Sequence, residues 1–117
     1  MALDIQFVDP LGTIQAVLPL EREVFETLHP YLNGYSAPNR LSRLSDYHTD
    51  VLWSERETPQ LRREVVELHE RLQERASSDN QAARDFLWRF EQFLRRAELQ
   101  GLQVRTLAED GPQPKGR

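Results

Sequence analysis

The sequence contains no cysteine, and this absence excludes three kinds of chemistry. Disulfide bonds, thiolate catalysis and cysteine-ligated zinc all require a thiol, and none of the 117 residues supplies one. The fold must therefore depend on burial of apolar side chains, which a chain of this length can provide without a covalent or metal staple. Lack of thiols fits the reducing cytoplasm, and a cytoplasmic location is expected.

The chain also lacks an excess of positive charge. Fifteen Lys and Arg stand against nineteen Asp and Glu, so the formal net charge is −4. Such a chain repels a phosphate backbone, and nucleic acid is not an expected partner. Eight arginines lie between positions 62 and 96, but the glutamates among them predict salt-bridged helix faces rather than a basic binding stripe.

Long apolar runs and glycine-rich loops are missing as well. No stretch approaches the roughly 18 apolar residues of a membrane-spanning helix, and residues 1–8 lack the order of a secretory signal, so no membrane partner is expected. The five glycines stand singly, at 12, 34, 101, 111 and 116. This spacing provides neither a phosphate-binding loop nor a Gly-x-Ser-x-Gly nucleophile turn. We expect no enzyme activity and no cofactor.

Apolar residues recur at the two-residue period of strands near both ends of the chain. They alternate over 3–7 and 14–18, and the intervening Asp9-Pro10-Leu11-Gly12 favours a turn, which predicts a hairpin. Leu102, Val104 and Thr106 predict a closing strand that pairs with this hairpin.

Three segments have the spacing of amphipathic helices. The first is expected from about Leu20 to Leu32, with Pro19 at its entry and Asn33-Gly34 as a stop. The second begins at Thr58-Pro59, where the Thr58 hydroxyl is expected to cap free N–H groups, and runs to about Arg75. Caps at 77–80 precede the third, which ends at Gly101.

Residues 35–57 have no clear period. A structureless loop of this length is unusual in a small domain, so we expect a helical turn near Leu41–Leu44 or a short strand around Val51–Trp53. The whole pattern predicts an α+β fold in which the N-terminal β-hairpin and a C-terminal strand form a small antiparallel sheet packed against three α-helices. It predicts one domain over 1–110 and a flexible tail over 111–117.

The segment Ser45-Asp46-Tyr47-His48-Thr49-Asp50 is the sharpest polar constellation in the sequence. On an extended strand Asp46, His48 and Asp50 would face one side, as metal ligands do. The spacing matches no established metal motif and a second histidine is missing, so solvated or capping loop residues and partner contacts are the preferred interpretations. No metal site is assigned.

The two tryptophans are candidates for core packing or for partner contact. For Trp88 we expect packing at the edge of the core. Trp53 has two open interpretations, an anchor for the irregular segment in the core and an anchor for a partner. Acidic residues surround it in the sequence, including Asp46, Asp50 and Glu55, and would steer a basic partner.

Over residues 3–108 the order of hairpin, Leu-Ser-Asp-Tyr loop, Thr-Pro helix start and final helix–Gly–strand resembles small bacterial proteins without an assigned function. The size and acidity of the chain resemble those of immunity proteins that neutralise a toxin. This resemblance implies a cytoplasmic inhibitor whose acidic, aromatic surface covers a basic site, and it assigns no role to single residues.

The leading hypothesis is a protein-binding module, immunity-like in kind, whose partner surface includes Asp46, Tyr47, His48, Asp50, Trp53 and Glu55. The alternative is a structural subunit that self-associates, as a homodimer or larger assembly, through the exposed faces of its two long helices. A small metal-dependent or acid–base enzyme built on Asp46, His48 and Asp50 is the third hypothesis.

Overall fold

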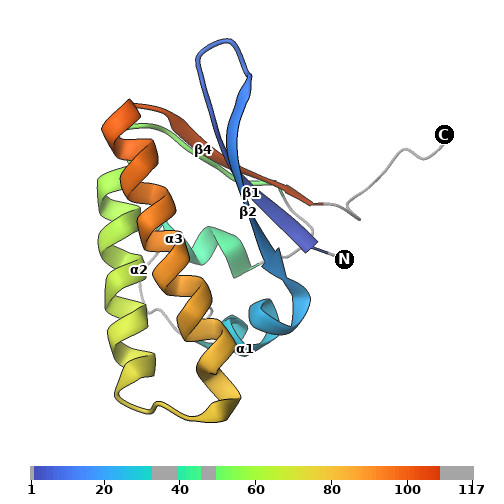
Figure 1. Ribbon diagram of the computed structural model, residues 1–117, viewed down its shortest axis with the longest axis vertical. Coiled ribbons are helices and arrows are strands. Elements are labelled where there is room, and N and C mark those ends of the chain that lie inside the picture. Colours follow the sequence, from blue (N-terminus) through green and yellow to red (C-terminus); the bar gives the residue numbers. More distant parts are fainter. Residues whose placement is uncertain (1, 33–39, 46–49, 109–117) are drawn as a thin grey trace, which may run out of the picture.

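The computed structural model describes residues 2–32, 40–45 and 50–108 of the chain (Figure 1). Asn33-Gly34 and the tail expected over 111–117 lie outside these residues. The described elements, in chain order, are β1 (Ala2–Val8), β2 (Ile14–Glu21), α1 (Arg22–Leu32), the 3₁₀ helix η1 (Leu41–Ser45), β3 (Leu52–Trp53), α2 (Thr58–Gln73), the 3₁₀ helix η2 (Ser78–Asn80), α3 (Gln81–Gln100) and β4 (Gln103–Ala108).

The strands form one antiparallel sheet in the order β2-β1-β4-β3. The expected α+β fold is confirmed: β1 pairs with β2 as a hairpin and with β4 from the end of the described chain. The irregular segment contains both of its expected elements, η1 and β3. The short β3 becomes the fourth strand by pairing with β4 at Leu52↔Arg105 and Trp53↔Val104.

The turn of the β1–β2 hairpin is fixed by Asp9. Its Oδ1 accepts hydrogen bonds from the backbone N–H groups of Leu11 at 3.0 Å and Thr13 at 2.9 Å, and its Oδ2 accepts from Gln15 Nε2 at 3.1 Å. Gly12 has a φ of 86°, a value that glycine adopts without steric cost. The turn predicted at residues 9–12 is confirmed, and the Asp9 carboxylate is part of its structure.

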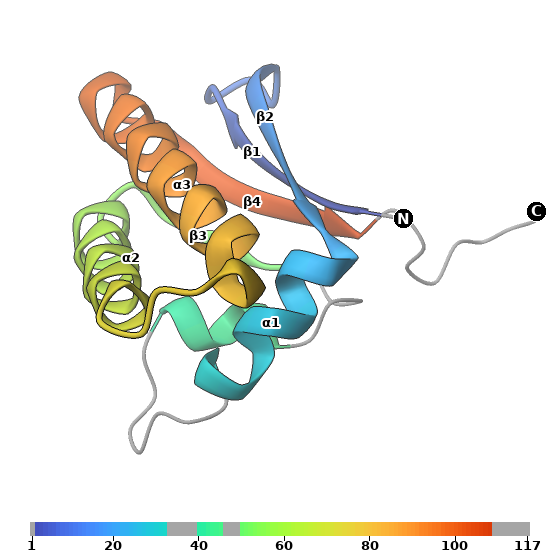
Figure 2. The same ribbon diagram turned by 60° about the horizontal axis from the view of Figure 1, so that its bottom comes forward.

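All three α-helices lie on one face of the sheet (Figure 2). Most of the strand side chains that point toward them are buried, and some of these meet aromatic residues of α3. The Phe7 and Phe93 rings lie 4.9 Å apart between centroids, and Trp53 and Phe90 lie 6.4 Å apart. The hydrophobic core is therefore a single layer between the sheet and the helices.

Helices α2 and α3 run side by side in opposite directions (Figure 1). The predicted apolar stripes are confirmed, because the side chains of Leu61, Val65, Leu68 and Leu72 on α2 and of Ala83, Phe86, Leu87, Phe90, Phe93, Leu94 and Ala97 on α3 are buried. In the connection, Asn80 Oδ1 accepts from the N–H of Ser77 at 3.2 Å. Gly101 ends α3 in the left-handed conformation, as predicted.

Two predicted helix starts are wrong in detail. Strand β2 continues through Pro19 to Glu21, so α1 begins at Arg22 rather than Leu20. An edge strand tolerates proline because its outer N–H has no ladder partner to lose. Thr58 is the first residue of α2 rather than its cap, and its hydroxyl donates backward to the Ser54 carbonyl at 3.2 Å.

Candidate functional site

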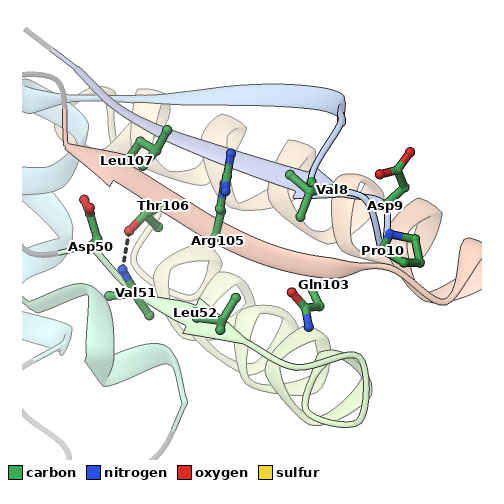
Figure 3. A pocket seen from close by; sticks show the side chains of 11 residues that line it. Val8, Asp9, Pro10, Asp50, Val51, Leu52, Gln103, Arg105, Thr106 and Leu107 are labelled. Atoms are coloured by element: carbon green, nitrogen blue, oxygen red, sulfur yellow. Dashed lines mark hydrogen bonds between the residues drawn. The ribbon is translucent and has the colours of Figure 1, made fainter.

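The face of the sheet opposite the helices is open over the described residues, and Figure 3 looks onto it. Cross-strand pairing identifies its residues, because partners in a register share one face. They are Asp4, Gln6 and Val8 on β1, Ile14, Val17 and Pro19 on β2, Gln103, Arg105 and Leu107 on β4, and Leu52 on β3. We call this surface the helix-free face.

The helix-free face is more apolar than an ordinary solvated sheet surface. Four of its large apolar side chains are exposed, Ile14 by 46%, Val17 by 48%, Leu52 by 55% and Leu107 by 39%. Leu11, at the tip of the hairpin, is also exposed. Solvated faces of antiparallel sheets normally alternate to polar residues. Several exposed apolar side chains on one face, with polar groups among them, are typical of an interaction surface.

The polar centre of this face is a pair of cross-strand neighbours. Arg105 Nε donates to Gln6 Oε1 at 3.0 Å, and Gln6 is only 5% exposed although it lies on the open side of the sheet. The two residues are direct cross-strand partners in the β1–β4 ladder. A buried amide bonded to a cation gives the face one fixed polar point among apolar side chains.

Beside this pair lies an open hollow of about 440 Å³ between the hairpin turn and β3. Val8, Leu52 and Leu107 provide apolar walls, and Arg105 projects from β4 (Figure 3). Asp50 stands at its border. A smaller hollow of about 140 Å³ lies around the start of β4 and is lined in part by Glu55.

A buried hydroxyl holds the wall that β3 contributes to the hollow. Thr106 Oγ1 accepts from the N–H of Val51 at 2.8 Å, while the N–H of Thr106 donates to the Val51 carbonyl at 2.8 Å. Thr106 is 1% exposed. This double connection extends the short pairing of β3 and β4 by one residue.

A charged clamp fixes the other side of β3. The Arg43 guanidinium donates to both carboxylate oxygens of Glu57, at 3.2 and 2.6 Å, and to the Leu52 carbonyl at 3.2 Å. The hydrogen bond from Arg43, followed by one from the backbone N–H of Ser54, lowers the pKa of Glu57 from its ordinary 4.5 to about 2. The clamp joins η1, β3 and the start of α2.

The structure describes only part of the surface that was predicted to contact a partner. Asp46, Tyr47 and His48 lie outside the described residues. Asp50 and Glu55 are exposed and border different hollows. Within 2–32, 40–45 and 50–108, no group of three His, Asp or Glu side chains is arranged to hold a metal ion.

Trp53 belongs to the core, which corrects its assignment to the partner surface. Its side chain is 0% exposed, and its indole N–H donates to the Arg40 carbonyl at 2.9 Å. A partner cannot contact this ring in the folded protein. The other tryptophan is also corrected: Trp88 is 60% exposed on α3 instead of packed at the edge of the core.

The arginines of α2 and α3 are used within the structure, as predicted for interleaved charges. Arg62 forms ion pairs with Glu91 at 3.1 Å and Glu98 at 2.9 Å, joining the two helices. These carboxylates raise the pKa of Arg62. Arg95 also pairs with Glu91, at 3.4 Å.

Sequence reasoning missed the helix-free face, although one signal for it was present. Apolar residues at 17, 52 and 107 fall between the inward positions of their strands, where an alternating pattern calls for polar residues. Ile14 was expected on the same face as Ala16 and Leu18, and it lies on the helix-free face because the register shifts between Phe7 and Val8.

Among the described residues, no helix is both long and apolar enough to cross a membrane. No family model, curated protein or solved structure matches this chain.

Proposed function

We propose that this chain is a protein-binding module and that its helix-free face receives a partner segment carrying apolar and basic side chains. The observation that carries the proposal is the exposure of Ile14, Val17, Leu52 and Leu107 on one open face. Burying such side chains favours association by roughly 25 cal/mol per Å² of apolar surface removed from water. The hollow beside Arg105 offers a place for one anchoring side chain.

The charge around this face supports the chemistry of the partner. Asp4 lies on the face, Asp50 borders the hollow, and Glu21 is cross-strand partner to Ala2 at the far end of the hairpin. Arg105 is the single cation on the strands of the face as described, and it is bonded to Gln6. Acidic groups beside exposed apolar side chains favour the approach of a basic partner and raise its association rate.

An inhibitor that covers a basic site on a toxin is the specific form of this proposal that the resemblance to immunity proteins implies. In such an inhibitor, the exposed apolar side chains of the helix-free face contact the toxin, and Asp50 and Glu55 lie at the rim of the interface. The enzyme hypothesis depends on Asp46 and His48, which lie outside the described residues.

The test compares leucines exposed on opposite sides of the molecule. Leu52 and Leu107 lie on the helix-free face, and Leu99 is 81% exposed on α3. Proteins retained from a bacterial lysate by the wild-type chain and by Leu52→Lys, Leu107→Lys and Leu99→Lys are quantified by mass spectrometry. The partner is then purified and its affinity for each chain is measured by calorimetry.

We expect Leu52→Lys and Leu107→Lys to weaken binding by at least about tenfold, since each places a cation where a basic partner docks. Leu99→Lys makes the same chemical change and is expected to leave the affinity unchanged. A partner that binds all four chains equally, or that loses affinity only with Leu99→Lys, contradicts the proposal.

A further inference from the structure

We infer that two copies of this chain associate through the outer edge of β2, by antiparallel pairing of the strand with itself about a two-fold axis at Val17. This surface differs from the long helix faces considered from the sequence. It shares Val17 with the helix-free face but uses the backbone groups of β2 rather than the hollow, so the association does not require the partner of the proposed function.

The sheet pairing determines which backbone groups of β2 point outward. The N–H of Thr106 donates to Val51 of β3, so Arg105 and Leu107 direct their backbone groups toward β1. Backbone direction alternates along each strand. On β1, the residues between those that bond β4 direct their backbone groups toward β2. On β2, Leu18 and Leu20 therefore direct their backbone N–H and C=O groups toward β1, and the backbone groups of Val17 and Pro19 point toward the outer edge.

Val17 is the residue on which a two-fold pairing can be centred. Proline has no N–H, so Pro19 offers only its carbonyl at the edge. On the other side of Val17 the ladder is irregular between Phe7 and Val8, opposite Ile14–Ala16. Between these two interruptions, Val17 presents both an outward N–H and an outward C=O, and two copies can exchange these groups reciprocally.

The side chains of β2 match this pairing. With Val17 opposite its own copy, Leu18 lies opposite Ala16 of the second copy, and Ala16 opposite its Leu18. Both residues face the core layer but are only partly buried, because no further strand covers them at the edge. Each Leu18 then packs against an Ala16 of the other copy, and the association buries apolar side chains that are only partly buried in a single copy.

The strand also lacks the usual protection of an edge. No charged residue lies between Ile14 and Leu20, whereas natural edge strands commonly carry Lys or another charge that prevents pairing. The absence of charge means that a second copy brings no like charges together. Figure 1 shows the hairpin projecting beyond the ends of α2 and α3, which leaves its outer half accessible.

Sedimentation velocity over roughly 10 µM to 1 mM tests the association, because a single strand edge buries less than the area of a standard stable interface and predicts a weak dimer. The average mass is expected to rise with concentration from one chain toward two. Val17→Pro removes the outward N–H and is expected to raise the dissociation constant by at least about tenfold. Circular dichroism verifies that the variant folds.

A cysteine comparison tests the register, and the absence of other thiols makes it unambiguous. In the proposed pairing two copies of Val17→Cys have Cα atoms about 5.5 Å apart, within disulfide range. Two copies of Ile14→Cys lie six residues out of register, about 20 Å apart. Ile14 and Val17 are on the same strand and are exposed to the same degree.

Under mild oxidation with diamide, Val17→Cys is expected to form a linked dimer at least about ten times faster than Ile14→Cys. Equal rates, or faster linkage of Ile14→Cys, overturn the proposal, as does a wild-type chain that stays monomeric to 1 mM. If Val17→Pro fails to fold, the cysteine comparison still decides. A foreign strand bound at this edge by a monomeric chain counts against the second copy as occupant.

Discussion

Replacing Thr106 with valine tests the connection that holds β3 to the sheet. Valine keeps the shape of threonine but lacks the hydroxyl that accepts from the N–H of Val51 at 2.8 Å. Thr106 is 1% exposed and Val51 is 9% exposed, so water cannot easily replace that acceptor. An unsatisfied buried donor costs about 1–3 kcal/mol.

We therefore expect Thr106→Val to lower the free energy of unfolding by about 2 kcal/mol, measured by urea denaturation at constant m-value. Thr106→Ser keeps the hydroxyl and removes a methyl group, so it is expected to cost about 1 kcal/mol. Hydrogen exchange at the Val51 amide should accelerate in the valine variant and change little in the serine variant. A valine variant as stable as wild type, or a serine variant less stable than the valine variant, would refute the reasoning.

Three further substitutions test separate parts of the structure. Glu57→Gln weakens the pair with Arg43 and is expected to lower the free energy of unfolding by about 1 kcal/mol at pH 7. Because folding lowers the pKa of Glu57 to about 2, the carboxylate stabilises the fold fully above pH 4.5, its ordinary pKa. In acid titrations the difference in stability between wild type and the variant should therefore shrink as the pH falls below 4.5. Trp53→Phe leaves the Arg40 carbonyl without its indole donor and should lower the free energy of unfolding in urea by about 2 kcal/mol. An unchanged free energy of unfolding would contradict the placement of this ring in the core. Gly101→Ala meets no atom within 4 Å, so the cost seen in thermal unfolding should come from its φ of 65° alone, about 1 kcal/mol, and an unchanged midpoint would contradict that cause.

The parts of the fold that the sequence predicts correctly depend on neighbouring residues. Asp9 and Gly12 determine a turn within five positions, and Gly101 ends α3 where a left-handed residue is required. Local signals also explain the wrong helix start. Proline at 19 suits a helix entry as well as an edge strand, and only the position of β2 at the edge of the sheet decides between them.

The parts that sequence reasoning missed depend on residues far apart in the chain. Glu64 is 6% exposed on α2, and its Oε1 accepts from the N–H of Leu41 at 2.8 Å, across 23 positions. The spacing of apolar residues along the helix does not distinguish this buried glutamate from the exposed charged residues beside it. Trp88 was misjudged, and two interpretations of Trp53 were left open, for a related reason: the burial of each ring depends on packing against distant elements.

Strand β1 has consequences for how the protein is made. Its neighbours in the sheet are β2, which follows after a few residues, and β4, whose register joins Leu3 to Ala108. During synthesis the hairpin emerges before β4, and one side of β1 has no neighbour until β4 has also left the ribosome. Strand β3 waits as well, because its ladder partner is β4. The pairing of β4 with β1 and β3 is therefore a late step in folding, because distant segments must lose loop-closure entropy before they gain contacts. Until then the apolar strands of the nascent chain are open to chaperones and to aggregation.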